Sequence, residues 1–156
     1  MNFPILSSLI LLPLVGSLFI FFIKKSSSGN YQNLKHVALF VSFANFLISI
    51  YIWYLFDPSS YEFQFTEKKK WLSGFVNYHV GIDGISILFI LLTTLIAPLC
   101  IVSINNSINF RIKEFLIAIL VMESLLIGVF CSLDLLIFYL FFEGGLIPMF
   151  LIIGIW

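Results

Sequence analysis

The sequence predicts an all-α integral membrane protein with about five transmembrane helices. Hydrophobic residues make up 61% of the 156 residues and charged residues only 10%, whereas soluble domains are about 25% charged. The 8 basic and 8 acidic residues balance one another, so the chain lacks the basic surface that binding to nucleic acid requires. We therefore expect the lipid bilayer as its environment and no nucleic acid as a partner.

The predicted spans follow from the length of the apolar stretches. A transmembrane helix needs roughly 20 apolar residues to cross about 30 Å of hydrocarbon. Five stretches meet this requirement, at residues 4–23, 37–56, 85–104, 115–133 and 135–156. None of them contains a Lys or an Arg. The first is not expected to be a cleaved signal peptide, because its basic residues follow the apolar run instead of preceding it.

These spans divide the chain into three segments. Residues 1–56 are expected to form a transmembrane hairpin, residues 57–84 a loop outside or at the surface of the membrane, and residues 85–156 the last three spans. Within the loop, Tyr61, Phe63 and Phe65 alternate with polar residues, which indicates a short interfacial strand. The first and third loops carry most of the basic residues, so they are expected to face the cytoplasm or the mitochondrial matrix.

Two acidic residues lie well inside spans, Glu123 in the fourth and Glu143 in the fifth. An ionisable group at the bilayer centre costs at least about 2.5 kcal/mol on insertion scales, so a function is the expected reason for each. Both lie ten residues from Leu133, in the tight turn between the two spans, which is about 15 Å along a helix. We therefore expect two carboxyls at one level near mid-membrane, able to pass a proton through water. The structural alternative is a protonated Glu that hydrogen-bonds a neighbouring helix as packing.

Other residues near these spans are assigned from their local chemistry. Pro148 has no N–H for the carbonyl of Gly144, so we expect a free carbonyl beside Glu143, which suits a hydrated relay; a kink for packing is the alternative. Asp83 and Asp134 precede spans and are expected to cap helices. The two cysteines have no metal-ligand spacing, and no metal site is expected.

Two stretches resemble a known family. The run GIDGIS at 81–86, followed by Thr93, Thr94 and Pro98, resembles the third helix of the antiporter-like subunits of respiratory complex I. The run FYLFFE that ends at Glu143, with LIPM at 146–149, resembles the fifth helix of NADH dehydrogenase subunit 4, the bacterial subunit M. The LIPM run separates this subunit from subunits 2 and 5 and argues against the multisubunit sodium/proton antiporters.

The resemblance implies the N-terminal part of an antiporter-like helical bundle, in a proton-translocating membrane-arm subunit of NADH:ubiquinone oxidoreductase. Glu143 takes the position of the key carboxylate of that family, and Glu123 takes the position of a second Glu on helix four. In the family, the helix-five Glu pairs with a Lys on a broken seventh helix. No predicted span of this sequence contains a Lys. We therefore expect a split or truncated product that a second chain completes with the missing C-terminal helices, with a fragment of a longer subunit as the alternative.

The resemblance also implies partners, cofactors and location. FMN, iron–sulfur clusters and ubiquinone are expected in other subunits, and no cofactor is expected on this chain. The expected partners are the other membrane-arm subunits of complex I, in the mitochondrial inner membrane or, alternatively, in a bacterial cytoplasmic membrane. Two other functions remain open: a structural or assembly subunit with idle carboxyls, and a subunit of a multisubunit cation/proton antiporter.

Overall fold

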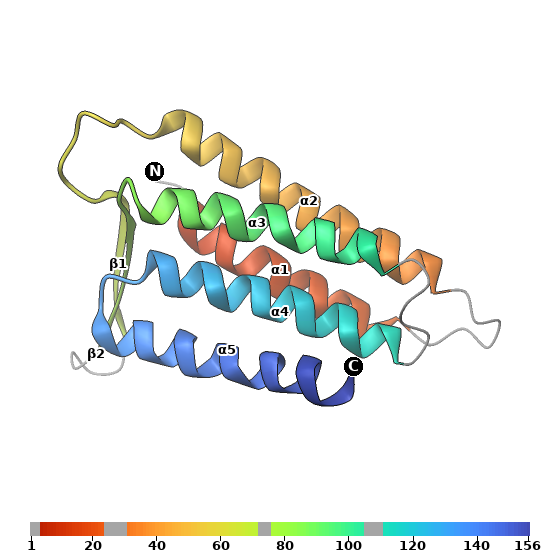
Figure 1. Cartoon of the computed structure of the whole chain (residues 1–156). Helices are drawn as coiled ribbons and strands as arrows, with labels where there is room; N and C mark the ends of the chain where they lie inside the picture. Colours follow the sequence, from red (N-terminus) through yellow and green to blue (C-terminus); the bar gives the residue numbers. More distant parts are fainter. Residues whose placement is uncertain (1–3, 24–30, 72–75, 105–110) are drawn as a thin grey trace.

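The computed structural model describes residues 4–23, 31–71, 76–104 and 111–156. The described residues form five helices and one two-stranded hairpin (Figure 1). Each helix is long and apolar enough to cross a membrane, which confirms the expected fold class. The helices are α1 (Ile5–Phe22), α2 (Gln32–Leu55), α3 (Ser86–Ser103), α4 (Ile112–Cys131) and α5 (Leu135–Ile155).

Helix α4 is the centre of the arrangement. It packs against α1, α3 and α5, and more lightly against α2. Helix α2 packs against α1 and α3 and closes a four-helix body made of α1, α2, α3 and α4. Helix α5 lies alongside α4 at the edge of this body (Figure 1). Within the described part of the chain, one face of α5 is therefore covered and the other is open.

The hairpin closes one end of the body. Its strands, β1 (Gln64–Trp71) and β2 (Val76–Ile82), pair in an antiparallel register with an irregularity between Gln64 and Glu67. Phe65 lies in this irregularity with a left-handed φ of 53°, the local distortion that a β-bulge produces. Of the three aromatic residues expected in an interfacial strand, only Phe65 lies in β1, because the strand begins later than the alternating pattern.

Charged side chains close both ends of α1. At its N-terminus, the carboxylate of Glu67 accepts hydrogen bonds from the N–H groups of Leu6 and Ser7, at 2.9 and 3.3 Å, and from the hydroxyl of Ser7. At its C-terminus, Lys113 Nζ donates to the carbonyls of Phe21 and Ile23, at 2.8 and 2.7 Å. Both arrangements satisfy backbone groups that a helix end leaves unpaired. The negative charge at the N-terminus and the positive charge at the C-terminus also interact favourably with the helix dipole.

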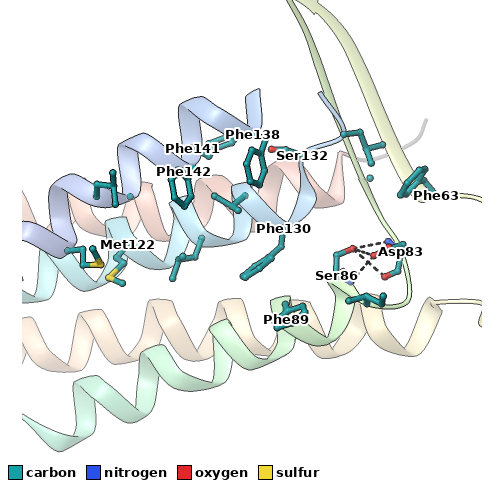
Figure 2. Close-up of a pocket in the computed structure, with 18 residues that line it drawn as sticks. Phe63, Asp83, Ser86, Phe89, Met122, Phe130, Ser132, Phe138, Phe141 and Phe142 are labelled. Atoms are coloured by element: carbon teal, nitrogen blue, oxygen red, sulfur yellow. Dashed lines mark hydrogen bonds between the residues drawn. The ribbon is translucent and has the colours of Figure 1, made fainter. Parts of the chain in front are cut away.

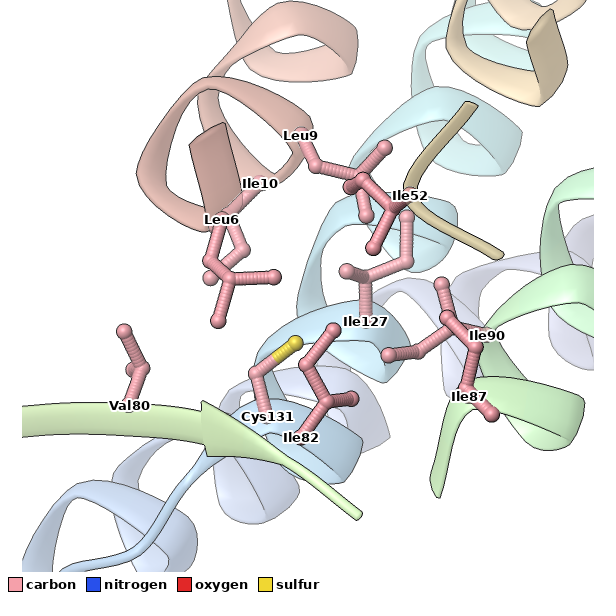
Figure 3. Packing of buried hydrophobic residues seen from close by; sticks show 10 residues of the cluster. All are labelled: Leu6, Leu9, Ile10, Ile52, Val80, Ile82, Ile87, Ile90, Ile127 and Cys131. Atoms are coloured by element: carbon pink, nitrogen blue, oxygen red, sulfur yellow. The ribbon is translucent and has the colours of Figure 1, made fainter. Parts of the chain in front are cut away.

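The interior of the body has two apolar clusters. The cluster next to the hairpin draws on α1, α2, β2, α3 and α4, as Figure 3 shows, and consists of Leu6, Leu9, Ile10, Ile52, Val80, Ile82, Ile87, Ile90, Ile127 and Cys131. The second cluster lies toward the other end and consists of Ile20, Leu34, Ala38, Ile101, Ile104, Leu116 and Leu120. Along all four helices, the residues between the clusters include the buried polar side chains Ser17, Ser42, Asn45, Ser49, Thr94, Glu123 and Ser124. We call these seven residues the polar layer.

Candidate functional site

The turn between α4 and α5 sets the depth of both acidic residues. Helix α4 ends at Cys131 and α5 begins at Leu135. The hairpin holds this turn, because Leu133 N–H donates to the carbonyl of His79 at 2.9 Å. Glu123 lies eight residues before the end of α4, and Glu143 lies eight residues after the start of α5. Each is therefore about 12 Å along its helix from the turn.

Glu123 lies in the interior of the four-helix body, in the polar layer. Its side chain is 2% exposed, and one carboxylate oxygen accepts a hydrogen bond from Asn45 Nδ2 at 2.8 Å. Asn45 is fully buried on α2, so this bond joins α2 to α4 through the middle of the body. Glu123 therefore faces α2.

Further hydrogen bonds accompany this pair in the polar layer. Ser49, one turn after Asn45 on α2, bonds Thr94 of α3 through their hydroxyls at 2.8 Å. Ser124, next to Glu123, donates to the carbonyl of Ile10 on α1 at 2.5 Å. Thr94 also donates to carbonyls of its own helix, at 3.0 and 3.1 Å. The polar layer thus joins α2 to α3 and α4 through side chains, and α4 to α1 through the carbonyl of Ile10.

Glu143 lies on the open face of α5. Its side chain is exposed, so no described helix covers the carboxyl that we expect near mid-membrane. The buried residues of α5 are Ile137 and Pro148, which face α4. Glu143 is six residues after Ile137, which places it about 240° around the helix from it. The two acidic residues therefore share a level but not an interface, because Glu123 faces α2 and Glu143 points away from α4.

Two grooves follow α4 on the side where α3 and α5 flank it. Figure 2 shows the first, of about 860 Å³, with Phe138, Phe141 and Phe142 of α5 across from Phe130 of α4 and Phe89 of α3. The second, of about 380 Å³, lies further along α3 and α4 and is lined in part by Glu123 and Thr93. Asp83 and Ser86 line part of the first groove. The lining of the second is almost wholly apolar, and Glu123 is its acidic residue.

Asp83 and Asp134 cap helices, as their positions predicted. Asp134 accepts a hydrogen bond from Leu136 N–H at 2.9 Å at the start of α5. Asp83 accepts from the backbone N–H of Ser86, the first residue of α3, at 2.7 Å, and from the Ser86 hydroxyl. The hydrogen bonds from Ser86 lower the pKa of Asp83 below its usual value. Among the described residues, no group of three His, Cys, Asp or Glu side chains lies close enough to hold a metal ion.

The polar partners on α2 are the part of the site that sequence reasoning missed. Ser42, Asn45 and Ser49 recur at intervals of three and four residues in an otherwise apolar span. That interval puts them on one face of a helix, which could have indicated a buried polar stripe.

Comparison with known proteins finds relatives over nearly the whole chain. It is 47% identical over 152 residues to NADH-ubiquinone oxidoreductase chain 4 of Marchantia polymorpha, covering 97% of this chain and 30% of the relative. It is 47% identical over 153 residues to NADH-quinone oxidoreductase subunit M of Rhodobacter capsulatus, covering 97% of this chain and 30% of the relative. For subunit M of Rickettsia typhi, the identity is 43% over 160 residues, covering 100% of this chain and 32% of the relative.

These matches extend over a limited part of each relative. The chain spans about 30% of the length of the curated relatives it matches, in their N-terminal part. No family model matches the chain. The resemblance to the N-terminal part of chain 4 and subunit M, first suggested by two short motifs, is thus confirmed over almost every residue of this chain.

Proposed function

We propose that this chain, whose sequence matches the N-terminal part of NADH–quinone oxidoreductase chain 4 and subunit M, is a proton-translocating membrane-arm subunit of that enzyme complex. In this proposal Glu143 is the carboxylate of the proton relay, and Glu123 is a second proton-carrying group. The redox chemistry belongs to other subunits, which would hold the FMN, the iron–sulfur clusters and the ubiquinone. The membrane is the mitochondrial inner membrane, or a bacterial cytoplasmic membrane.

The observation that carries this proposal is the position of Glu143. It lies at mid-depth of an apolar helix, on the face that no described helix covers. A carboxyl in contact with lipid at that depth costs at least about 2.5 kcal/mol, and such groups almost always face a protein interior or a water-filled cavity. We therefore expect further helices to cover this face.

The covering partner should carry a basic or strongly polar group. Within the described helices, the only Lys residues are Lys35 and Lys113, in the first turns of α2 and α4. Neither helix presents its Lys at the level of Glu143. A cation that pairs with Glu143 would therefore lie outside the described helices, for example on a helix that corresponds to the C-terminal part of the longer relatives. Changing the distance between such a pair would alter the proton affinity of both groups, which is the physical basis of a relay.

A structural role is the second candidate, and the hydrogen bond between Glu123 and Asn45 favours it. A neutral Glu bonded to a neighbouring helix stabilises a membrane bundle by itself. For Glu143, no described hydrogen bond offers the same explanation. The two acidic residues therefore have to be tested separately.

The test compares E143Q and E123Q in the assembled native complex. We expect E143Q to assemble but to lower NADH-driven proton uptake about 10²-fold or more, the loss typical of removing an acid–base group. The measurements are NADH oxidation with quinone and proton uptake by the same membranes. E114Q is the matched control, because Glu114 is an exposed residue in the first turn of α4 and should leave both rates unchanged.

Unchanged proton uptake by an assembled E143Q complex would show that the relay role is wrong and would favour the scaffold. NADH:quinone activity that copurifies with this chain supports the proposal. Cation/proton exchange without that activity would identify a separate antiporter instead.

A further inference from the structure

The polar layer contains two buried polar atoms that no described residue satisfies, Asn45 Oδ1 and Glu123 Oε2. They belong to the two side chains that the bond from Asn45 Nδ2 to Glu123 Oε1 already joins. A buried polar atom without a partner costs about 1–3 kcal/mol. Two of them on one pair require a physical reason.

The missing element of this pair is a hydrogen-bond donor. An ionised carboxylate only accepts, and the amide oxygen of Asn also only accepts. A protonated carboxyl carries one O–H donor. One proton on Glu123 Oε2 would therefore satisfy both atoms, since the O–H would donate to Asn45 Oδ1 while Asn45 Nδ2 continues to donate to Oε1.

Among the described residues, no charge lies near enough to stabilise the ionised form instead. Helices α1 and α3, which pack against α4, contain no Lys, Arg, His, Asp or Glu. The charged or basic residues of α2 and α4 other than Glu123 are all within the first five residues of their helices: Lys35, His36, Lys113 and Glu114. These positions are about 15 Å along the helices from the pair. On α5, Glu143 points away from α4, and the thiol of Cys100 on α3 lines the same groove as Glu123.

We infer that Glu123 and Asn45 form a one-proton site, in which Glu123 is held as the neutral acid by two hydrogen bonds with the Asn45 amide. Asn45 is a positioning residue, because it acts through Glu123. The groove of about 380 Å³, which Glu123 lines in part, is the described cavity beside the carboxyl. The inference deepens the proposed function and rests on it in one respect: the proton held here is the one that Glu123 would contribute to the relay.

This site gives α2 a role in proton transfer. The sequence pattern identified α2 only as a span, and its polar stripe faces the centre of the body. Ser49 and Thr94 bond each other one turn away and leave Asn45 as the α2 side chain with a described bond to Glu123. A substitution of Asn45 should therefore change the hydrogen bonding of the Glu123 carboxyl, and a substitution of its polar neighbours on α2 should not.

The test is infrared spectroscopy of the native complex in the C=O stretching region of protonated carboxyls. The difference between wild type and E123Q at neutral pH should contain one band, which is the protonated carboxyl of Glu123. In N45L the Glu123 carbonyl loses its N–H donor, so this band should move to higher frequency. S42A is the control, because Ser42 is a buried α2 residue in the polar layer that donates to its own helix, and the band should stay in place.

Absence of the band from the difference spectrum, or an unmoved band in N45L, would overturn the inference. If N45L does not assemble, N45A removes volume instead of adding it and should shift the band in the same direction. The spectrum does not depend on proton pumping. Normal pumping by E123Q together with the expected bands would reject Glu123 as a relay group and keep the site. Lost pumping by E123Q without the expected band would reject the one-proton site and keep Glu123 as a relay group.

Discussion

The four-helix body and α5 differ in how they surround a carboxyl in a membrane span: the body buries it, and α5 exposes it. In the body, Glu123 is 2% exposed and bonded to Asn45 of another helix. On α5, Glu143 is exposed, and the only buried residues of the helix are Ile137 and Pro148. The two groups are at the same level on neighbouring antiparallel helices, so depth does not distinguish them. Their neighbours do.

The two regions also differ in how far their polar groups are satisfied within this chain. The body satisfies most of its polar groups internally and is closed at both ends of α1 by Glu67 and Lys113. Helix α5 is attached along one face and offers its polar group outward. A relay that uses both carboxyls therefore needs a partner at Glu143 but not at Glu123. The contact between α4 and α5 is the feature that holds the outward carboxyl in place.

The largest expected effect comes from breaking that contact at Gly128. A Cβ atom at Gly128 would lie 2.7 Å from two ring atoms of Phe141 on α5, so Gly128→Ala forces the ring to move. Overpacking of this kind costs about 1–3 kcal/mol, of which the higher helix propensity of Ala returns up to about 1 kcal/mol. We expect a net loss in the free energy of unfolding, measured by denaturant titration of the full chain in detergent micelles.

Gly144→Ala is the matched control on the other side of the same interface. Its Cβ would lie 3.5 Å from Leu125, an ordinary contact, so the change should be neutral or stabilise by up to about 1 kcal/mol. Equal effects of the two substitutions would show that α5 is not held by close packing at Gly128.

The next effect concerns the body alone. Glu67→Gln removes the negative charge that α1 receives at its N-terminus, although an amide oxygen can still accept one of the bonds. A charge at a partly buried helix end contributes about 1 kcal/mol, and we expect a loss of that order in the same titration. The body should loosen at its hairpin end while the α4–α5 contact remains.

Glu62→Gln provides the comparison for this charge. Glu62 is exposed and lies between the end of α2 and the start of β1, away from any helix N-terminus. A loss as large as that of Glu67→Gln would mean that net charge, and not the helix end, is responsible.

Much of the fold follows from the sequence, because the span lengths depend on local composition. All five helices were expected, and the turn from 132 to 134 lies where predicted. The hairpin was anticipated only as a short strand, since its register depends on Val80 pairing with Glu67 and bridging to Ser132, which are far apart in the chain. Local alternation around Tyr61 does not contain that information.

The sequence predicts the depth of Glu123 and Glu143 along their helices, but not the neighbouring helix that each side chain faces. Helix α5 is apolar around its whole circumference apart from Glu143, so no periodic pattern indicates which face meets α4. Glu123 lies in a helix with a similar composition, and its partner Asn45 is 78 residues away in the sequence. Such a pairing depends on how α2 and α4 cross, which is a property of the packed body.

The smallest expected effect is a pH dependence in the hairpin that closes the body. Tyr78 lies on β2 with its hydroxyl 3.1 Å from that of Ser7. Burial raises the pKa of Tyr78, the bond with Ser7 opposes this, and the nearby carboxylate of Glu67 adds to the rise.

Because the folded pKa is raised, the folded state keeps the Tyr78 proton more tightly than the unfolded chain does. The resulting stability is fully present below the unfolded pKa of about 10 and is lost as the pH rises through the folded value. We expect Tyr78→Phe to reduce the fall in thermal midpoint between about pH 9 and pH 11, whereas Tyr54→Phe, at an exposed tyrosine of α2, should leave it unchanged. Helix α5 has no part in this contact, so the α4–α5 interface should respond equally in both variants. An equal alkaline loss of stability in wild type and Tyr78→Phe would show that deprotonation of this tyrosine does not open the hairpin end of the body.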